Sequence, residues 1–146
     1  MAELGEVQNL VASWWFDYDR GAFDVFGDYF TADARFTCRS DSGATAFEEF
    51  VTADVSGHDA LVAWQVEHRR SSPYPLRHNG TNVHLVSPDE FRSYLFVTQI
   101  VGGGVSNLSS GTCTGRVHAE GGRVRFAELH VVLDFTDSEV FSARSC

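Results

Sequence analysis

The chain has 146 residues, enough for one domain with a substantial core, and 12 of them are phenylalanine. Its formal net charge is −9, and all 11 of its Lys and Arg residues are arginine. Because an acidic surface is repelled by phosphates, this balance argues against nucleic acid and against an anionic membrane surface as partners.

The N-terminal residues lack the charged and apolar regions of a signal peptide, and no run of roughly eighteen apolar residues predicts a membrane span. The three cysteines, Cys38, Cys113 and Cys146, are an odd number without the spacing of metal ligands. We therefore expect no disulfide framework and no metal site, and we predict a protein of the reducing cytoplasm.

The N-terminal half is predicted to be mostly helical. Apolar residues recur at intervals of three and four from Leu4 to Tyr18, which predicts an amphipathic helix over residues 3–18 that Gly21 ends. A short second helix is expected near residues 23–30, a third over residues 46–55 and a fourth over residues 59–70. Between the second and the third, residues 34–39 alternate as a strand, and a turn follows at residues 40–43.

The C-terminal half is predicted to form strands. Alternating or β-branched segments cover residues 77–86, 91–101, 110–119 and 123–136, with turn signals between them. Gly102-Gly103-Gly104 predicts either a loop or a bulge at which a sheet bends. Helices followed by antiparallel strands indicate the α+β class. We expect residues 1–146 to form a single cone-shaped domain, in which a strongly curved antiparallel sheet and three to four N-terminal helices enclose an apolar cavity.

Three side chains suited to acid–base chemistry are candidates for this cavity. Tyr18 and Asp19 end the first helix, and His78 lies on the first of the C-terminal strands. Imidazole exchanges protons near neutral pH, and a buried carboxylate beside it fixes its tautomer. Together they would suffice to remove a proton next to a carbonyl group without a cofactor. The structural alternatives are a core aromatic for Tyr18, a helix cap for Asp19 and a core histidine for His78.

Several motifs resemble a known family. Asp19-Arg-Gly-Ala-Phe-Asp, Phe30-Thr-Ala-Asp-Ala-Arg-Phe and the segment from Gly122 to Asp134 resemble the SnoaL-like group of the nuclear-transport-factor-like superfamily. The resemblance covers roughly residues 5–135. That superfamily includes polyketide cyclases, ketosteroid isomerase, scytalone dehydratase, epoxide hydrolases and non-catalytic subunits. The resemblance therefore implies the cone fold and leaves the reaction open.

The resemblance to scytalone dehydratase is more informative than the one to ketosteroid isomerase. The tyrosine and the carboxylate of the isomerase fall on Trp14 and Cys38, which disfavours its chemistry here. The Tyr-Asp pair and the strand histidine of the dehydratase fall on Tyr18, Asp19 and His78. By resemblance, the aspartate orients the histidine, which is the base, while tyrosines hold a carbonyl through water. Polyketide cyclases of the group likewise share the helical aspartate and use a histidine or carboxylate base.

Two features depart from the dehydratase. Its second tyrosine falls on Cys38, and its second catalytic histidine has no counterpart, the nearest positions being Gln99 and Val101. We therefore expect a different substrate.

Further candidates are expected to line the cavity and bind substrate. Asn82 and His84 follow His78 in steps of two and share its face if the strand is regular. Tyr94 would supply a second phenol and His130 a second proton carrier, although structural roles remain alternatives for both. The predicted substrate-binding residues are Trp14, Cys38, Asn82, Tyr94 and His130. Three other histidines, His58, His68 and His118, receive no role.

The sequence thus predicts a cofactor-independent lyase or isomerase, of the dehydratase or cyclase type, acting on a hydroxylated cyclic ketone or polyketide-like compound. His78 would be the base, oriented by Asp19, and Tyr18 would stabilise the enolate. One alternative is a non-catalytic ligand-binding or interaction subunit. Another is an epoxide hydrolase or epoxide-opening cyclase that uses Asp19 and Asp134. The expected partners are a small apolar or aromatic oxygenated substrate and, by analogy with relatives, a second or third copy of the chain, with neither nucleic acid nor membrane.

Overall fold

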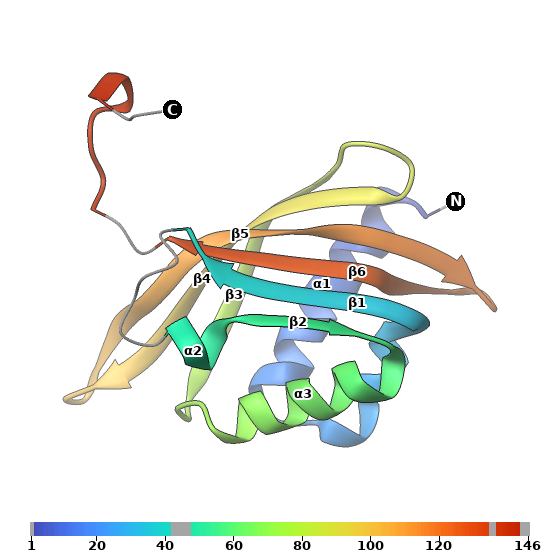
Figure 1. The fold of residues 1–146 in the computed structure, drawn as a ribbon, viewed down its shortest axis with the longest axis horizontal. Helices are drawn as coiled ribbons and strands as arrows, with labels where there is room; N and C mark the ends of the chain where they lie inside the picture. The colour runs from blue at the N-terminus through green and yellow to red at the C-terminus, as the bar shows by residue number, and fades with distance from the viewer. Residues whose placement is uncertain (1, 42–47, 135–136, 144–146) are drawn as a thin grey trace.

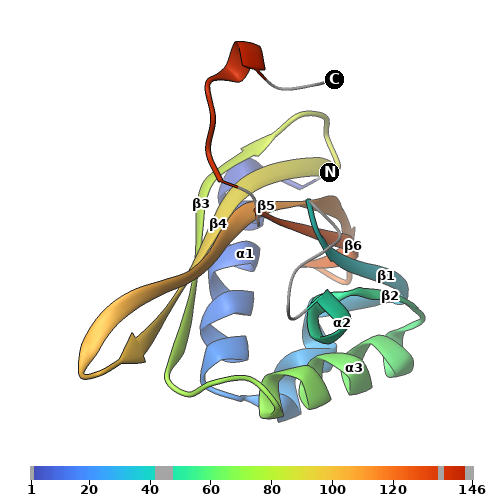
Figure 2. The ribbon, with the colours of Figure 1, turned by 60° about the vertical axis from the view of Figure 1, so that its left-hand side comes forward.

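The computed structural model describes residues 2–41, 48–134 and 137–143. One six-stranded sheet curves around the helices, which lie on its concave side (Figures 1 and 2). The strands are β1 (Phe30–Ser40), β2 (Ala53–Ser56), β3 (Leu76–Leu85), β4 (Glu90–Val101), β5 (Gly104–Glu120) and β6 (Arg123–Asp134). The helices are α1 (Leu4–Asp19), α2 (Glu48–Val51) and α3 (His58–Arg70), with 3₁₀ turns η1 (Phe23–Tyr29) and η2 (Phe141–Ala143). This architecture confirms the predicted α+β class and the curved sheet.

The strands lie in the order β2-β1-β6-β5-β4-β3, and one pairing departs from the predicted antiparallel sheet. Strand β1 pairs with β6 in parallel, while the other neighbours are antiparallel. The predicted third helix, over residues 46–55, is wrong in its second half. Helix α2 ends at Val51, and Ala53–Ser56 forms the edge strand β2, with Val55 opposite Phe36 of β1. Residues 46 and 47 lie outside the described residues.

Helix α1 forms because its apolar residues follow the helical repeat. One stripe is buried: Val7, Leu10, Val11, Trp14, Trp15 and Tyr18. A reciprocal pair of hydrogen bonds between Glu3 and Glu6 caps its first turn. The helix lies close to β3 because Gly80 has no side chain. A Cβ atom there would be only 3.1 Å from Cδ1 of Trp15.

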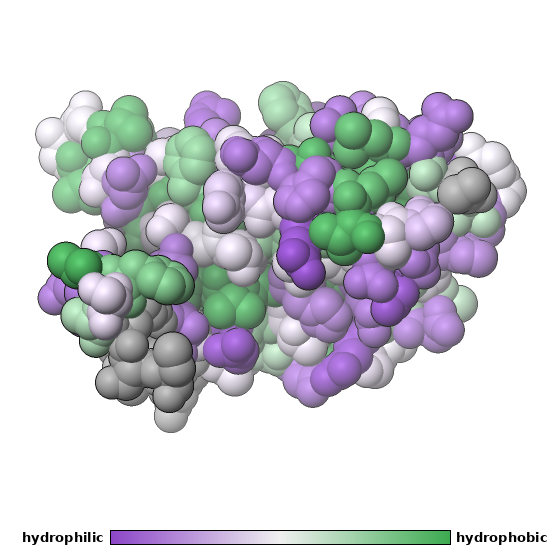
Figure 3. Space-filling model, turned by 90° about the horizontal axis from the view of Figure 1, so that it is seen from above, coloured by the Kyte–Doolittle hydropathy of each residue, from purple (hydrophilic) through white to green (hydrophobic). Residues whose placement is uncertain are grey.

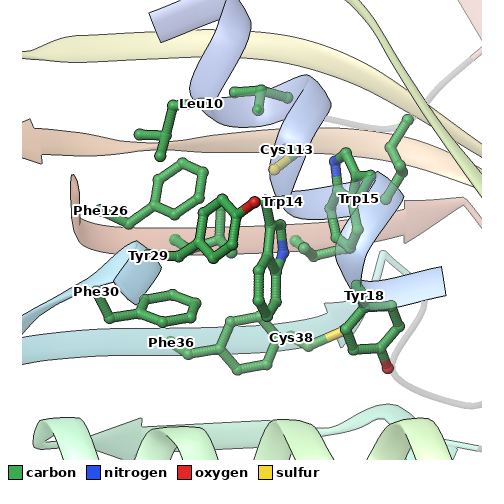
Figure 4. Close-up of a cluster of buried hydrophobic side chains, with 14 of the residues drawn as sticks. Leu10, Trp14, Trp15, Tyr18, Tyr29, Phe30, Phe36, Cys38, Cys113 and Phe126 are labelled. Atoms are coloured by element: carbon green, nitrogen blue, oxygen red, sulfur yellow. The ribbon is translucent and has the colours of Figure 1, made fainter. Parts of the chain in front are cut away.

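An aromatic cluster anchors the C-terminal half of α1 (Figure 4). Trp14 is fully buried, and its ring meets Phe26, Tyr29 and Phe30 at centroid distances of 5.0, 5.3 and 5.0 Å. Such edge-on contacts between large rings add to the stabilisation from buried area. The cluster therefore fixes the end of α1, where Tyr18 and Asp19 lie.

The surface is mixed in character. Seen from above, hydrophilic side chains alternate with separate hydrophobic groups (Figure 3). Tyr94 and Phe96, on the outer face of β4, are exposed, as is Val105 near the turn between β4 and β5. Within the described part of the chain, no helix has the length and apolar character that crossing a membrane requires.

Candidate active site

A cavity of about 200 Å³ lies between the sheet, the end of α1 and α3. Most of its walls are apolar. They include Phe36 and Val131 on β1 and β6, Leu95 and Val97 on β4, and Trp64 on α3. A few polar side chains, His78 and the hydroxyl-bearing Tyr18 among them, also face it. An apolar cavity with a few converging polar groups is the usual form of a small-molecule site.

His78 and Asp19 form a closely bonded pair beside the cavity. Nδ1 of His78 lies 2.6 Å from Oδ1 of Asp19, and the backbone N–H of His78 donates to Oδ2 of Asp19 at 2.8 Å. The two side chains are 13% and 14% exposed. Asp19 is not part of the cavity wall, so His78 stands between this carboxylate and the cavity. The carboxylate thus binds Nδ1, so Nε2 is the ring nitrogen of His78 that is not bonded to Asp19.

Two aromatic side chains of α1 hold the imidazole in place. The ring of Trp15 stacks on His78 at a centroid distance of 4.6 Å and an interplanar angle of 6°. Tyr18 meets His78 edge-on at 5.2 Å. Burial raises the pKa of Tyr18, and the charge of Arg69 opposes this shift while that of Asp19 adds to it. Tyr18 therefore remains a neutral phenol that can donate a hydrogen bond, and its hydroxyl points away from the aromatic cluster (Figure 4).

Arg69, at the end of α3, connects the elements that carry the site. It is 5% exposed and donates to the carbonyl oxygens of Tyr18 and Asp19 at 2.8–3.1 Å. It also donates to Oγ of Ser72 and to the carbonyl of Pro73, at 2.9 and 3.0 Å. The bonds to Tyr18 and Asp19 satisfy carbonyl groups at the end of α1 that have no partner within the helix. Arg69 thus positions Asp19 through its backbone.

We expect Arg69→Met to lower the free energy of unfolding by about 2–4 kcal/mol, because several enclosed carbonyl groups would lose a charged donor. Chemical denaturation measures this loss. Arg70→Met is the matched control, since Arg70 is the exposed neighbour and stacks on Phe23. Equal stabilities for the two variants would contradict the positioning role of Arg69.

The structure brings some predicted site residues together and leaves others outside. Tyr18, His78 and Cys38 line the cavity, with Asp19 behind His78. Trp14 does not reach the cavity, because its ring is enclosed within the aromatic cluster. Asp134, expected as one half of a carboxylate pair, is exposed at the end of β6 and accepts a hydrogen bond from Ser110. No carboxylate lines the cavity among the residues that the structure describes.

Three strand residues also lie away from the cavity, contrary to expectation. Asn82 has a φ of +57° at a register shift in β3, so the alternation reverses there and Val83 packs against the core instead. Tyr94 is 60% exposed on the outer face of β4. His130 also lies outside the cavity lining, with its Nδ1 2.6 Å from Oγ1 of Thr37 on β1.

Two polar residues of α3 were not assigned a role from sequence but line the cavity. They are Gln65, which is buried, and His68. The signal was present: Leu61, Gln65 and His68 follow the same i, i+4, i+7 stripe, and Leu61 is fully buried. A position on the apolar stripe of a helix places even a polar residue inside.

His68 is held between two aromatic rings, Phe50 at a centroid distance of 4.4 Å and Trp64 at 4.5 Å. Burial lowers the pKa of His68 to about 4, and the proximity of His78 and of the Arg69 guanidinium adds to this effect. The ring is consequently neutral in the folded protein at neutral pH. None of the described residues forms a hydrogen bond with it.

This environment predicts a pH dependence of stability. Between about pH 6.5 and 4, the unfolded chain binds a proton on His68 that the folded chain does not, so the free energy of unfolding decreases as the pH falls. Above about pH 6.5, His68 does not change the free energy of unfolding with pH. Because the ring is partly exposed, we expect less than about 1.4 kcal/mol per pH unit. Chemical denaturation of the wild type and of His68→Gln across this pH range measures the free energy of unfolding of each protein. An equal pH dependence in the two proteins would contradict the effect of His68.

Among the described residues, no group of three or more His, Cys, Asp or Glu side chains is arranged to hold a metal ion.

The family can be decided from a comparison of sequences. The profile of the SnoaL-like domain matches residues 1–130. The chain belongs to the SnoaL-like family. No curated protein matches this SnoaL-like chain in sequence.

Solved structures agree on the fold of this SnoaL-like domain. An NTF2-like protein with a cystatin-like fold from Novosphingobium aromaticivorans has a TM-score of 0.70 at 16% identity, over 88% of this chain and 80% of the other. From the same organism, a protein provisionally assigned as a scytalone dehydratase has a TM-score of 0.68 at 15% identity, over 92% and 87%. The β subunit of benzoate 1,2-dioxygenase from Burkholderia mallei has a TM-score of 0.66 at 21% identity, over 91% of both chains. At these identities the likeness concerns the fold.

Proposed function

We propose that this SnoaL-like protein is a cofactor-independent lyase or isomerase, of the dehydratase or cyclase type, acting on a hydroxylated cyclic ketone or related polyketide-like compound. One observation carries the proposal. His78 lines an apolar cavity while its Nδ1 is bonded to the enclosed carboxylate of Asp19. A carboxylate accepts but does not donate, so the neutral imidazole carries its proton on Nδ1 and keeps a lone pair on Nε2.

The reaction begins with removal of a proton next to the carbonyl group by Nε2 of His78. The charge that develops on the carbonyl oxygen is stabilised by a hydrogen bond from the Tyr18 hydroxyl, directly or through water. Collapse of the enolate expels a β-hydroxyl group, moves a double bond or closes a ring. The proton on Nε2 then leaves with hydroxide as water in dehydration, moves to another carbon in isomerisation, or protonates the alkoxide that forms when a ring closes onto a carbonyl group. Apolar walls strengthen these hydrogen bonds by excluding water.

The size of the cavity narrows the substrate class. A dry apolar cavity of roughly 150 Å³ holds benzene, so about 200 Å³ suits a compound with one or two rings. Because of this size, we favour a one- or two-ring hydroxylated ketone over a larger fused-ring system. General-base catalysis contributes roughly 10²–10⁴-fold to the rate, which is sufficient for removing protons that are already acidic.

A second candidate function is a non-catalytic ligand-binding or interaction subunit. It is favoured by the solved β subunit of a dioxygenase that shares this fold, and by the departures from the dehydratase pattern, in which Cys38 replaces the second tyrosine and the second histidine has no counterpart. The epoxide-opening alternative lacks support, because Asp134 is exposed outside the cavity.

Proton exchange separates the two functions. We would follow the α-proton signals of 2-tetralone, a two-ring ketone, by NMR in D₂O with and without the protein. The proposed base accelerates the loss of these signals over buffer, even if this ketone is not the natural substrate. Binding of the ketone without acceleration, repeated over hydroxylated one- and two-ring ketones, would instead support the binding subunit.

The homo-oligomer and the cytoplasmic location both stay predictions. Exposed apolar residues on β4, among them Tyr94 and Phe96, are consistent with contacts between copies. Light scattering on the purified chain tests the oligomer, with a monomer as the contradicting result, and localisation in the source cells tests the compartment.

A further inference from the structure

A second polar group lies in the cavity wall, apart from the pair of His78 and Asp19. Gln65 of α3 is 3% exposed and lines the cavity. Its Nε2 is enclosed and has no hydrogen-bond partner among the residues that the structure describes. Rotation about the last torsion of the side chain exchanges the two ends of the amide, so Gln65 can present either an N–H donor or a carbonyl acceptor.

The position of Gln65 does not require an amide for folding. It lies on the buried stripe of α3, four residues after Leu61, where an apolar side chain of similar size would pack. A buried donor without a partner destabilises a fold, whereas an apolar replacement of the same shape is close to neutral or stabilising. A group of this kind in a native protein requires an explanation, and a functional role is one of the recognised ones.

His68 lies beside Gln65 on the same wall, three residues further along the helix. Its ring is clamped between Phe50 and Trp64 and has no hydrogen bond with any described residue. A neutral imidazole offers one donor and one acceptor. The two side chains therefore form a polar pair, Gln65 and His68, within largely apolar surroundings.

We infer that Gln65, with His68 beside it, binds a second oxygen of the substrate, while Tyr18 binds the reacting carbonyl oxygen and His78 removes the proton next to it. The identity of the reacting end of the substrate rests on the proposed function. The binding of the second oxygen by Gln65 does not depend on it. The substrate class becomes a one- or two-ring ketone that carries a further hydroxyl or carbonyl group at a distance from the reacting carbonyl. A compound without that oxygen would leave the amide of Gln65 unpaired, which discriminates against it.

A matched pair of probes tests the inference. The compounds 6-hydroxy-1-tetralone and 1-tetralone share a ring system and a ketone, and they differ only in the distant hydroxyl group. Calorimetric titration gives the dissociation constant of each. For the wild type we expect the hydroxylated probe to bind about tenfold more tightly, the effect of one good hydrogen bond. For Gln65→Leu we expect this preference to disappear, with the affinity for 1-tetralone retained.

Two controls keep the test decisive. Gln8→Leu makes the same chemical change on the exposed side of α1, where Gln8 donates to the carbonyl of Val83, and it should leave the preference intact. Thermal unfolding of Gln65→Leu without ligand should show an unchanged or raised Tm, because an unpaired amide is removed. A lowered Tm would indicate a structural role for the amide and overturn the inference.

The remaining outcomes separate this inference from the proposed function. Wild-type protein that binds both probes equally, or neither, contradicts the role of Gln65. A preference that persists in Gln65→Leu does the same. If the preference is present and lost in Gln65→Leu while α-proton exchange is never accelerated, the binding of the second oxygen stands and the proposed catalysis fails.

Discussion

Replacing His78 by alanine is expected to lower the rate of α-proton exchange by at least about 100-fold. The reason is that His78 is the one side chain at the cavity whose ring nitrogen is bonded to a buried carboxylate, among the residues that the structure describes. Without the imidazole, water must accept the proton in an apolar cavity that stabilises the resulting charges poorly. The exchange assay with 2-tetralone measures the effect directly.

Two control variants make this result specific. His84→Ala removes an exposed imidazole from the same strand and should leave the rate unchanged. Tyr18→Phe removes the donor but keeps the ring, and it should cost less than His78→Ala because the base remains. Since Trp15 stacks on His78, the Tm of His78→Ala must be measured alongside the rate. A folded His78→Ala protein with the wild-type rate would remove His78 from the mechanism.

The pattern along α1 carried most of the information about the site. Its apolar stripe places Tyr18 inside and ends the helix at Asp19. Alternation in the first part of β3 places His78 on the same side as Leu76, facing α1. Periodicity could therefore predict that these side chains approach one another, but not that one carboxylate binds both the ring and the backbone of His78. That geometry depends on Arg69, which holds the end of α1 from a distant helix.

The predictions that failed have separate physical causes. Asn82 was placed by strict alternation, yet its positive φ shifts the register of β3 and reverses the faces beyond it. Tyr94 and His130 lie on strands whose inward face cannot be chosen from alternation alone, because both faces of this sheet carry apolar residues. Gln65 and His68 received no role from the sequence, although their spacing on the buried stripe of α3 places them at the cavity.

Asp19→Asn should be nearly as damaging to catalysis as loss of the base, although the side chain keeps its shape. In the wild type, both oxygens of Asp19 accept hydrogen bonds from His78, one from the backbone N–H and one from Nδ1. An asparagine has only one acceptor at this end and must turn its NH₂ group toward one of the two donors. If the oxygen remains on the backbone N–H, the NH₂ group faces Nδ1, and the imidazole must then move its proton to Nε2.

A proton on Nε2 removes the lone pair that faces the substrate, so we expect α-proton exchange to fall by at least about 100-fold. Binding of 1-tetralone should change little, because Asp19 does not line the cavity. Asp17→Asn is the matched control, since Asp17 lies two residues before Asp19 and accepts hydrogen bonds from Arg20 and Tyr29 instead. The NMR signals of the His78 ring report the tautomer independently of the rate. A wild-type rate with an unchanged tautomer in Asp19→Asn would show that the carboxylate does not set the basicity of His78.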